Sequence, residues 1–294
     1  MSVYFQYPED IEMWGASFNT VIAGWGVQGE VTYRQNAPFQ LDTDQLTIAN
    51  AFAQCASWGT GSAGVALQLI QTMKAENCPY NDDLSMTAVQ KAAAGIVTGN
   101  RDIHGYIENE MFTAQIGTTA TFTSSEWWLD MMGADLGVLV TEVGMVYVPG
   151  VEDTWIDNLA SPLLAGPQYQ NTGCQATDLP LGGFLDLRDG ASAQCRPTDF
   201  SAGLVLLYTQ QYNNAFDTGF VLSPQLVYSY DFEGTTAAPY GNYMEDRQAL
   251  GLGLSGTLNN NFRVGVNYTA YFGGHINNKA KDQDFASFTA SYSF

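Results

Sequence analysis

The sequence has little charge for its length. Only 14% of its 294 residues are charged, and Lys and Arg together number 10, whereas roughly a quarter of the residues of an ordinary soluble domain carry charge. Because soluble proteins cover their exterior with such side chains, we expect much of this exterior not to face water. The net charge of −20 also argues against a nucleic-acid partner, since phosphate binding requires clustered Lys and Arg.

Long hydrophobic runs are missing as well. The best apolar candidate, residues 136–148, is interrupted by Glu142, and a membrane-spanning helix needs about 20 apolar residues. If the chain crosses a membrane, the remaining structure is the closed β-barrel, because helices and closed barrels alone leave no backbone group unpaired in lipid. The N-terminus also lacks the basic and apolar regions of a signal peptide, so we expect the chain to be truncated there.

Motifs for catalysis are scarce. The chain has two histidines, His104 and His275, and it contains no G-x-S-x-G nucleophile motif, phosphate-binding loop or dinucleotide fingerprint. A hydrolase at a barrel rim, with His275 near Ser287 or Ser291, is the enzymatic alternative. We expect no enzyme and no cofactor.

The four cysteines form two local pairs, Cys55 with Cys78 and Cys174 with Cys195. Four cysteines allow three pairings, and the sequence does not choose among them. Each pair lies within a long polar segment, which favours two loop-closing disulfides and an oxidising compartment. We expect no metal site, because there is no C-x-x-C motif and the acidic loop residues lack the spacing of a calcium loop.

A strand pattern is what the sequence does have. In residues 285–294, apolar or aromatic side chains alternate with Ser and Thr up to Tyr292 and Phe294, which places the two sets on opposite faces of one strand. This ending resembles the last strand of Gram-negative outer-membrane β-barrels, in which a terminal aromatic residue serves the insertion machinery. The resemblance implies that Tyr292 and Phe294 belong to an insertion signal.

The same alternation predicts eight further strands and a stub at residues 3–7. Within residues 103–123 the alternation slips between Glu110 and Phe112, which predicts a β-bulge, and Pro224 in the middle of a strand counts against the pattern. Bacterial barrels have even strand numbers, so the nine strands become ten with the stub, or more if others precede it. The predicted strands are residues 11–22, 25–36, 103–123, 136–148, 201–212, 218–232, 247–258, 262–273 and 285–294.

The connections between these strands alternate in length. Most of those on one side are long, and those on the other are short, as in bacterial barrels with long outer loops and short periplasmic turns. We therefore predict an all-β transmembrane antiparallel up-and-down β-barrel, or the C-terminal part of a larger one, as a single domain over residues 1–294. Its main outer loops, residues 37–101 and 149–198, are expected to contain short helices and both cysteine pairs.

Several short runs along the whole chain are familiar together. They include residues 7–11, 15–20, 29–34, 142–144, 222–224, 228–231 and 284–288. In these the chain resembles the outer-membrane family known as domain-of-unknown-function 1302. The resemblance implies a porin-like barrel of which this chain is the C-terminal half, in the outer membrane of a Gram-negative bacterium. It also implies an association with export systems or with the breakdown of hydrophobic compounds, and it supplies no catalytic residues.

Charged residues on the polar faces of the strands are the candidates for function. Opposed acidic and basic rows across a lumen select solutes, as charged rings do in channels; in the alternative interpretation they pair with one another and fill a plugged interior. The sequence therefore predicts a channel for small, including hydrophobic, solutes, with a non-conducting scaffold or accessory of an export system as the alternative. The candidate lumen-lining residues are Glu30, Arg34, Glu142, Arg247 and Arg263.

Overall fold

The structure is a computed structural model, and it describes residues 7–40, 106–151, 197–259, 261–274, 278 and 280–294. Strands with alternating apolar and polar side chains make up nearly all of its regular structure. The elements are β1 (Met13–Ile22), β2 (Trp25–Gln40), β3 (Tyr106–Thr123), α4 (Trp127–Met131), β4 (Leu136–Tyr147), β5 (Phe200–Ala215), β6 (Phe220–Glu233), β7 (Gln248–Leu258), β8 (Phe262–Phe272) and β9 (Phe285–Tyr292).

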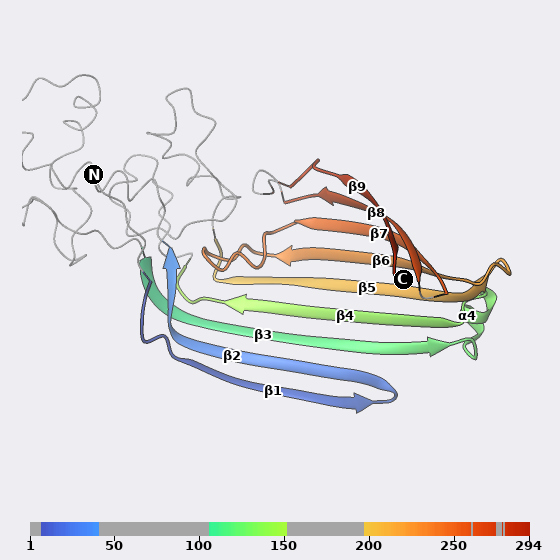
Figure 1. Cartoon of the computed structure of the whole chain (residues 1–294). Coiled ribbons are helices and arrows are strands. Elements are labelled where there is room, and N and C mark those ends of the chain that lie inside the picture. The colour runs from blue at the N-terminus through green and yellow to red at the C-terminus, as the bar shows by residue number, and fades with distance from the viewer. Residues whose placement is uncertain (1–6, 41–105, 152–196, 260, 275–277, 279) are drawn as a thin grey trace, which may run out of the picture.

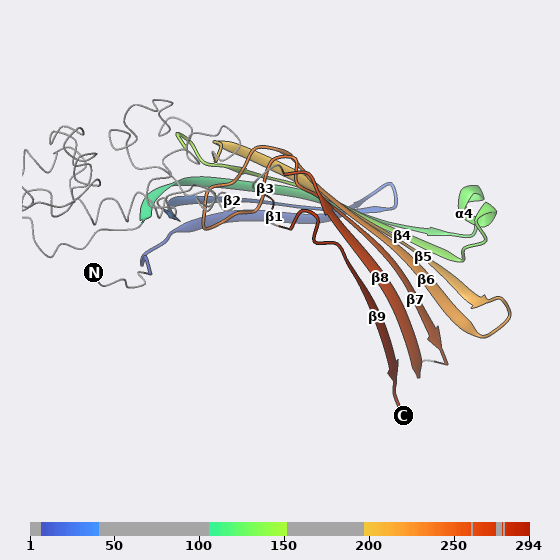
Figure 2. The ribbon, with the colours of Figure 1, turned by 90° about the horizontal axis from the view of Figure 1, so that it is seen from above.

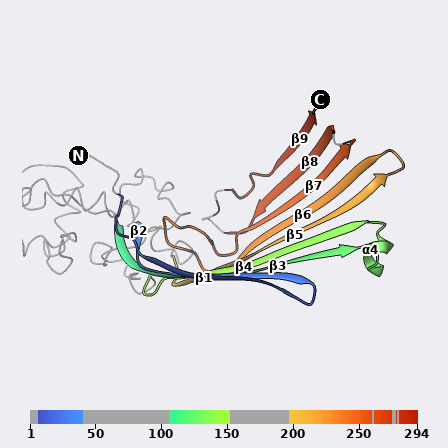
Figure 3. The same cartoon turned by 60° about the horizontal axis from the view of Figure 1, so that its bottom comes forward.

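The nine strands form one antiparallel sheet in which each strand pairs with the next along the chain. Figure 1 shows β1 and β9 at the two edges of this sheet. Seen from above (Figure 2), the strands change direction steadily from β1 to β9, so the sheet is strongly twisted, as unconstrained sheets are. Figure 3 shows the same twist of the sheet from another side. The all-β antiparallel fold is confirmed, whereas closure into a barrel stays a prediction, because β1 and β9 do not pair with each other.

Apart from the end of β2, the described strand boundaries lie within three residues of the predicted ones, and three differences concern the site. The strand β2 continues to Gln40, so residues 37–40 belong to the sheet rather than to the outer loop predicted to begin at residue 37. A five-residue helix, α4, occupies part of the turn predicted between β3 and β4. The bulge lies opposite its predicted place, because the register shifts between Arg34 and Ala37, and the extra residue is on β2.

The predicted stub at residues 3–7 lies outside the described residues, apart from Tyr7. At Pro224, which cannot donate a backbone hydrogen bond, the β5–β6 register is the same on both sides, with Thr209 opposite Gln225 and Tyr212 opposite Leu222. The sheet therefore accommodates this proline without a shift. In the described part of the chain, no helix is long and apolar enough to span a membrane.

The register gives the sheet two faces of different chemistry, because directly paired residues of neighbouring strands point to the same side. On one side, which we call the apolar face, apolar side chains line up across the strands, and the row Pro224, Leu254, Val266, Phe288 is an example. On the opposite polar face, the corresponding row is Ser223, Ser255, Gly265, Thr289.

The apolar face is largely uncovered by the described residues. Leu252 is 47% exposed, Val266 53% and Phe288 70%, and Leu226 beside them is half-buried. Soluble monomers rarely expose a contiguous apolar surface this wide. These side chains therefore do not form the dry core of a sandwich within the described chain.

A cluster of buried apolar side chains lies at the end of the sheet where the longer connections lie, and at the opposite end Leu129 of α4 is buried as well. At the former end the connection between β6 and β7, residues 234–247, folds back over the polar face, and we call it the strap. The bulge in β2 turns two apolar residues, Ala37 and Phe39, toward the strap, and both are 0% exposed. The buried cluster comprises Ala37, Phe39, Met111, Val146, Val148, Val151 and Ala237, with Tyr240 and Tyr243 of the strap against it.

Candidate functional site

The strap reaches the sheet at two glycines. Gly144 of β4 and Gly203 of β5 are directly paired on the polar face, and the side chain of Tyr243 lies against both. A Cβ atom at Gly203 would lie 2.8 Å from Cδ1 of Tyr243, and one at Gly144 would overlap its hydroxyl. Glycine in a strand interior often marks such a close approach. Glycine at these two positions thus leaves room for the Tyr243 ring, which a side chain at either position would displace.

An ion pair joins Asp231, on the strand that precedes the strap, to Arg247, the last residue of the strap. Oδ2 of Asp231, near the end of β6, accepts hydrogen bonds from Nε of Arg247 at 2.7 Å and from the backbone N–H of Met244 at 3.0 Å. Nη2 of Arg247 lies 2.7 Å from the same oxygen and also donates to the carbonyl of Asn242 at 2.8 Å. The side chain of Asp231 is 11% exposed and that of Arg247 36%. This mostly shielded, charge-assisted pair is stronger than an exposed ion pair.

Buried hydroxyl groups complete the attachment of the strap. Oγ1 of Thr236, which is 1% exposed, lies 2.7 Å from Oγ of Ser201 and accepts from the backbone N–H of Tyr243 at 3.1 Å. The backbone N–H of Thr236 donates to the carbonyl of Tyr243 at 3.0 Å. Oγ1 of Thr198 similarly accepts from the backbone N–H of Thr235 at 2.9 Å. The strap is therefore bonded to the sheet and to itself, and the buried hydroxyls of Thr235 and Thr236 both have partners.

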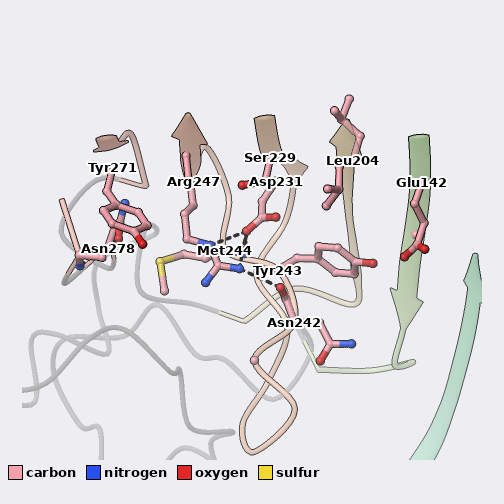
Figure 4. A pocket seen from close by; sticks show the side chains of 16 residues that line it. Glu142, Leu204, Ser229, Asp231, Asn242, Tyr243, Met244, Arg247, Tyr271 and Asn278 are labelled. Carbon is pink, nitrogen blue, oxygen red and sulfur yellow. Dashed lines mark hydrogen bonds and ion pairs between the residues drawn. The ribbon is translucent and has the colours of Figure 1, made fainter. Parts of the chain in front are cut away.

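Between the strap and the polar face lies a pocket of about 560 Å³, a volume within the usual range for small-molecule sites. The sheet contributes side chains from β4 to β8, the strap contributes Tyr243 and Met244, and Asn278 closes one end (Figure 4). Figure 4 shows Glu142 and Arg247 on opposite sides of the Tyr243 ring. The charged side chains that line the pocket are Glu142, Asp231 and Arg247.

The pKa of the Tyr243 hydroxyl reflects the surroundings of this ring in the pocket. Burial, together with the negative charges of Asp231 and Glu142, raises the pKa of its hydroxyl above the ordinary value for tyrosine. Both carboxylates disfavour the tyrosinate, because like charges repel at short range. Burial is the larger cause of this shift, and the two carboxylates add to it.

The predicted lumen-lining residues divide between the pocket and the rest of the polar face. Glu142 and Arg247 line the pocket. Glu30 is on β2, two strands from Glu142 on β4, and lies in the neighbouring row of the same face, level with Gly144. Arg34 lies at the strap end, with its Cζ 6.0 Å from the centre of the Tyr240 ring. Arg263 lies toward the short-turn end, opposite Ser291. All face the same side, and their role in selectivity stays a prediction.

The other predicted residues fall in two groups. Tyr292 and Phe294 end the chain on or just beyond β9, with their ring centres 6.4 Å apart, and both are strongly exposed; their role as an insertion signal stays a prediction. Cys55, Cys78, Cys174, Cys195, His104 and His275 lie outside the described residues. The proposed disulfides and the alternative hydrolase site therefore stay predictions.

Sequence reasoning missed the partner of Arg247 and the ring in the pocket. Asp231 falls on the polar side of its strand in the sequence pattern, but nothing in that pattern pairs it with Arg247, because the strap separates them. Tyr243 lies in a segment without periodicity. The available signal was the facing pair Gly144 and Gly203, which becomes visible only when the β4–β5 register is known.

The described fold defines the class of this protein as an all-β protein built from one antiparallel sheet, with one apolar and one polar face. More specifically, the chain belongs to the family described as Protein of unknown function (DUF1302), whose model matches residues 1–294. The expected family membership is thus confirmed. A comparison with curated proteins gives no match.

Proposed function

We propose that this chain forms the wall of an outer-membrane β-barrel that passes small solutes along its polar face, in a Gram-negative bacterium. The observation that carries the proposal is the apolar face, which continues across all nine strands and has no covering layer in the described chain except where α4 packs on it at the short-turn end. Eight of the nine described strands have 10 to 18 residues, which suffices to cross a hydrocarbon layer, since a tilted strand needs about 9–11 residues; β9 has 8. Lipid is the solvent that makes such a face stable.

The polar face supports a water-filled or partly filled lumen rather than a dry interior. It carries Ser, Thr, Gln and Gly together with charged side chains of both signs, and the strap narrows it at the end with the long connections. The exposure of the Tyr292 and Phe294 side chains supports their proposed recognition by barrel-insertion machinery. Small, uncharged or amphipathic solutes are the class of cargo that fits a lumen with few charges.

A non-conducting barrel that serves as an accessory of an export system is the second candidate. The strap favours it, because residues 234–247 lie on the polar face and are fixed there by Asp231 and Arg247. If the residues outside the described part fill the remaining space, no solute passes. We propose neither a hydrolase nor any other enzyme.

Planar-bilayer recording of the chain refolded into vesicles separates these candidates. We expect protease-resistant insertion into the vesicles and stepwise conductance after fusion with the bilayer. Insertion without conductance, even after the long connections at residues 41–105 and 152–196 are shortened, would select the accessory. Failure to insert under conditions that refold a known outer-membrane barrel would contradict both candidates.

A further inference from the structure

The pocket beneath the strap has one charge without a partner. Asp231 and Arg247 neutralise each other, with Oδ2 of Asp231 bound to both Nε and Nη2 of Arg247. Glu142 is exposed and, among the described residues, makes no ion pair or side-chain hydrogen bond. Three charged groups therefore leave the pocket with a net charge of about −1 at neutral pH.

The surroundings of this carboxylate suit a cation that also has an apolar part. The ring of Tyr243 lies between Glu142 and Arg247, and the ring of Tyr271 and the side chain of Met244 line the same pocket on the Arg247 side (Figure 4). Aromatic faces attract cations, most strongly quaternary ammonium groups. The side chains of Val205 and Ala249 add apolar surface from the sheet. An inorganic cation would find one carboxylate and few further oxygen ligands, so a metal ion is the poorer fit.

We propose that this pocket binds an organic cation, such as a quaternary or primary ammonium compound with an apolar body, and that Glu142 supplies the charge that recognises it. The Glu142 carboxylate lies close enough to the Tyr243 ring to raise the pKa of its hydroxyl, after the larger effect of burial, so a ligand at this ring would also meet the carboxylate. An organic anion is disfavoured, because Arg247 is already engaged by Asp231 and by the carbonyl of Asn242. As a solute site the pocket rests on the proposed channel, whereas binding itself is measurable without any conductance.

The test is calorimetric titration of the refolded chain in an uncharged detergent with benzyltrimethylammonium chloride, and in parallel with sodium benzenesulfonate. We expect saturable binding of the cation alone. Glu142→Gln keeps the shape of the side chain and removes its charge, and it should weaken cation binding about tenfold or more, equivalent to the loss of one ionic contact. The matched control is Glu245→Gln, which removes the same charge from an exposed strap residue that does not line the pocket.

The outcomes separate the two proposals. Cation binding that depends on Glu142 and not on Glu245 supports the pocket whether or not the chain conducts. Equal weakening by both substitutions would show a non-specific charge effect and overturn the assignment. Binding of benzenesulfonate in place of the cation, or no binding of either probe by a correctly folded chain, would also overturn it, even if bilayer recording shows a channel.

Discussion

The apolar side chains at the strap end of the sheet are buried, whereas those in the middle of the sheet are exposed. Around the strap, Phe39 and Met111 are 0% and 1% exposed, packed by other parts of the same chain. In the middle of the sheet, Leu252 and Leu254 are 47% and 50% exposed and meet no covering layer in the described residues. The strap end is built like the core of a soluble protein, whereas the proposed function gives the middle of the sheet an apolar solvent.

This difference assigns the two regions to different sources of stability. Packing and hydrogen bonds within the chain hold the strap end, so its stability should depend little on the surrounding medium. The stability of the middle of the sheet should depend on what touches the apolar face, because lipid removes that surface from water. Substitutions at the two places should therefore respond differently to a change of medium.

The largest effect is expected for Phe39→Ala. The Phe39 ring is fully buried and lies 5.2 Å, centre to centre, from the Tyr240 ring, so its removal leaves a cavity and should lower the free energy of unfolding by about 3–5 kcal/mol. Urea unfolding should show a similar loss in detergent micelles and in lipid vesicles.

The control for this substitution is Phe112→Ala on the apolar face, where the ring is 39% exposed. Its removal leaves no internal cavity and should cost no more than the transfer of one side chain to an apolar medium, about 1.5–3 kcal/mol. If Phe39→Ala were the milder of the two in both media, the strap end would not be a packed core.

The next largest effect should distinguish the two faces of one strand. Leu254 and Ser255 are neighbours in the middle of β7, both are exposed, and they point to opposite sides. Leu254→Arg should lower the free energy of unfolding in lipid vesicles by about 2–4 kcal/mol, as for arginine on the lipid face of a barrel. Ser255→Arg should change it by no more than about 0.5 kcal/mol, as for an ordinary surface substitution.

The measurement is the urea midpoint of each variant after refolding in vesicles of one lipid composition. Equal and small effects of the two arginines would mean that the apolar face does not contact lipid. In that case the covering layer would be protein, and the proposed membrane-spanning function would be wrong.

The sequence pattern predicted the sheet well because its information is local. Alternation with a period of two assigns each side chain to a face, and the predicted ends of β7 and β8 lie within one residue of the observed ones. The exception at β2 is informative: the bulge after Arg34 breaks the alternation, so Ala37 and Phe39 were assigned to a loop although they continue the strand. A local pattern cannot predict how a strand continues beyond a register shift when the residues after the shift pack against a segment far away in the sequence.

The candidate site was predictable only in part, for the same physical reason. The positions of Glu142 and Arg247 on the polar side followed from alternation, and their shared pocket did not. That pocket depends on how the strap folds back, which is decided by the glycine pair and by Asp231. These contacts join residues of β4, β5 and β6 to a segment with no repeating pattern of its own.

The smallest effect, and the one most specific to the strap, is expected for Gly203→Val. The new side chain would crowd both the Tyr243 ring and the carboxylate of Asp231, since its Cβ would lie 2.8 Å from Cδ1 of that ring and 2.8 Å from Oδ1 of Asp231, and overpacking of this kind costs about 1–3 kcal/mol. Gly251→Val on β7 is the matched control, because a Cβ there meets its nearest neighbour, Val227, at an ordinary 3.6 Å. Limited proteolysis should cut the strap of the Gly203 variant much faster than that of the control, and circular dichroism should show that the sheet remains folded in both variants.

If the chain conducts, the Gly203 variant should also show a larger single-channel current, because a displaced strap no longer narrows the polar face. A strap that stays protected in the Gly203 variant would mean that neither the Tyr243 ring nor Asp231 needs the space at Gly203 to hold it, and the glycine pair would then have no part in shaping the pocket.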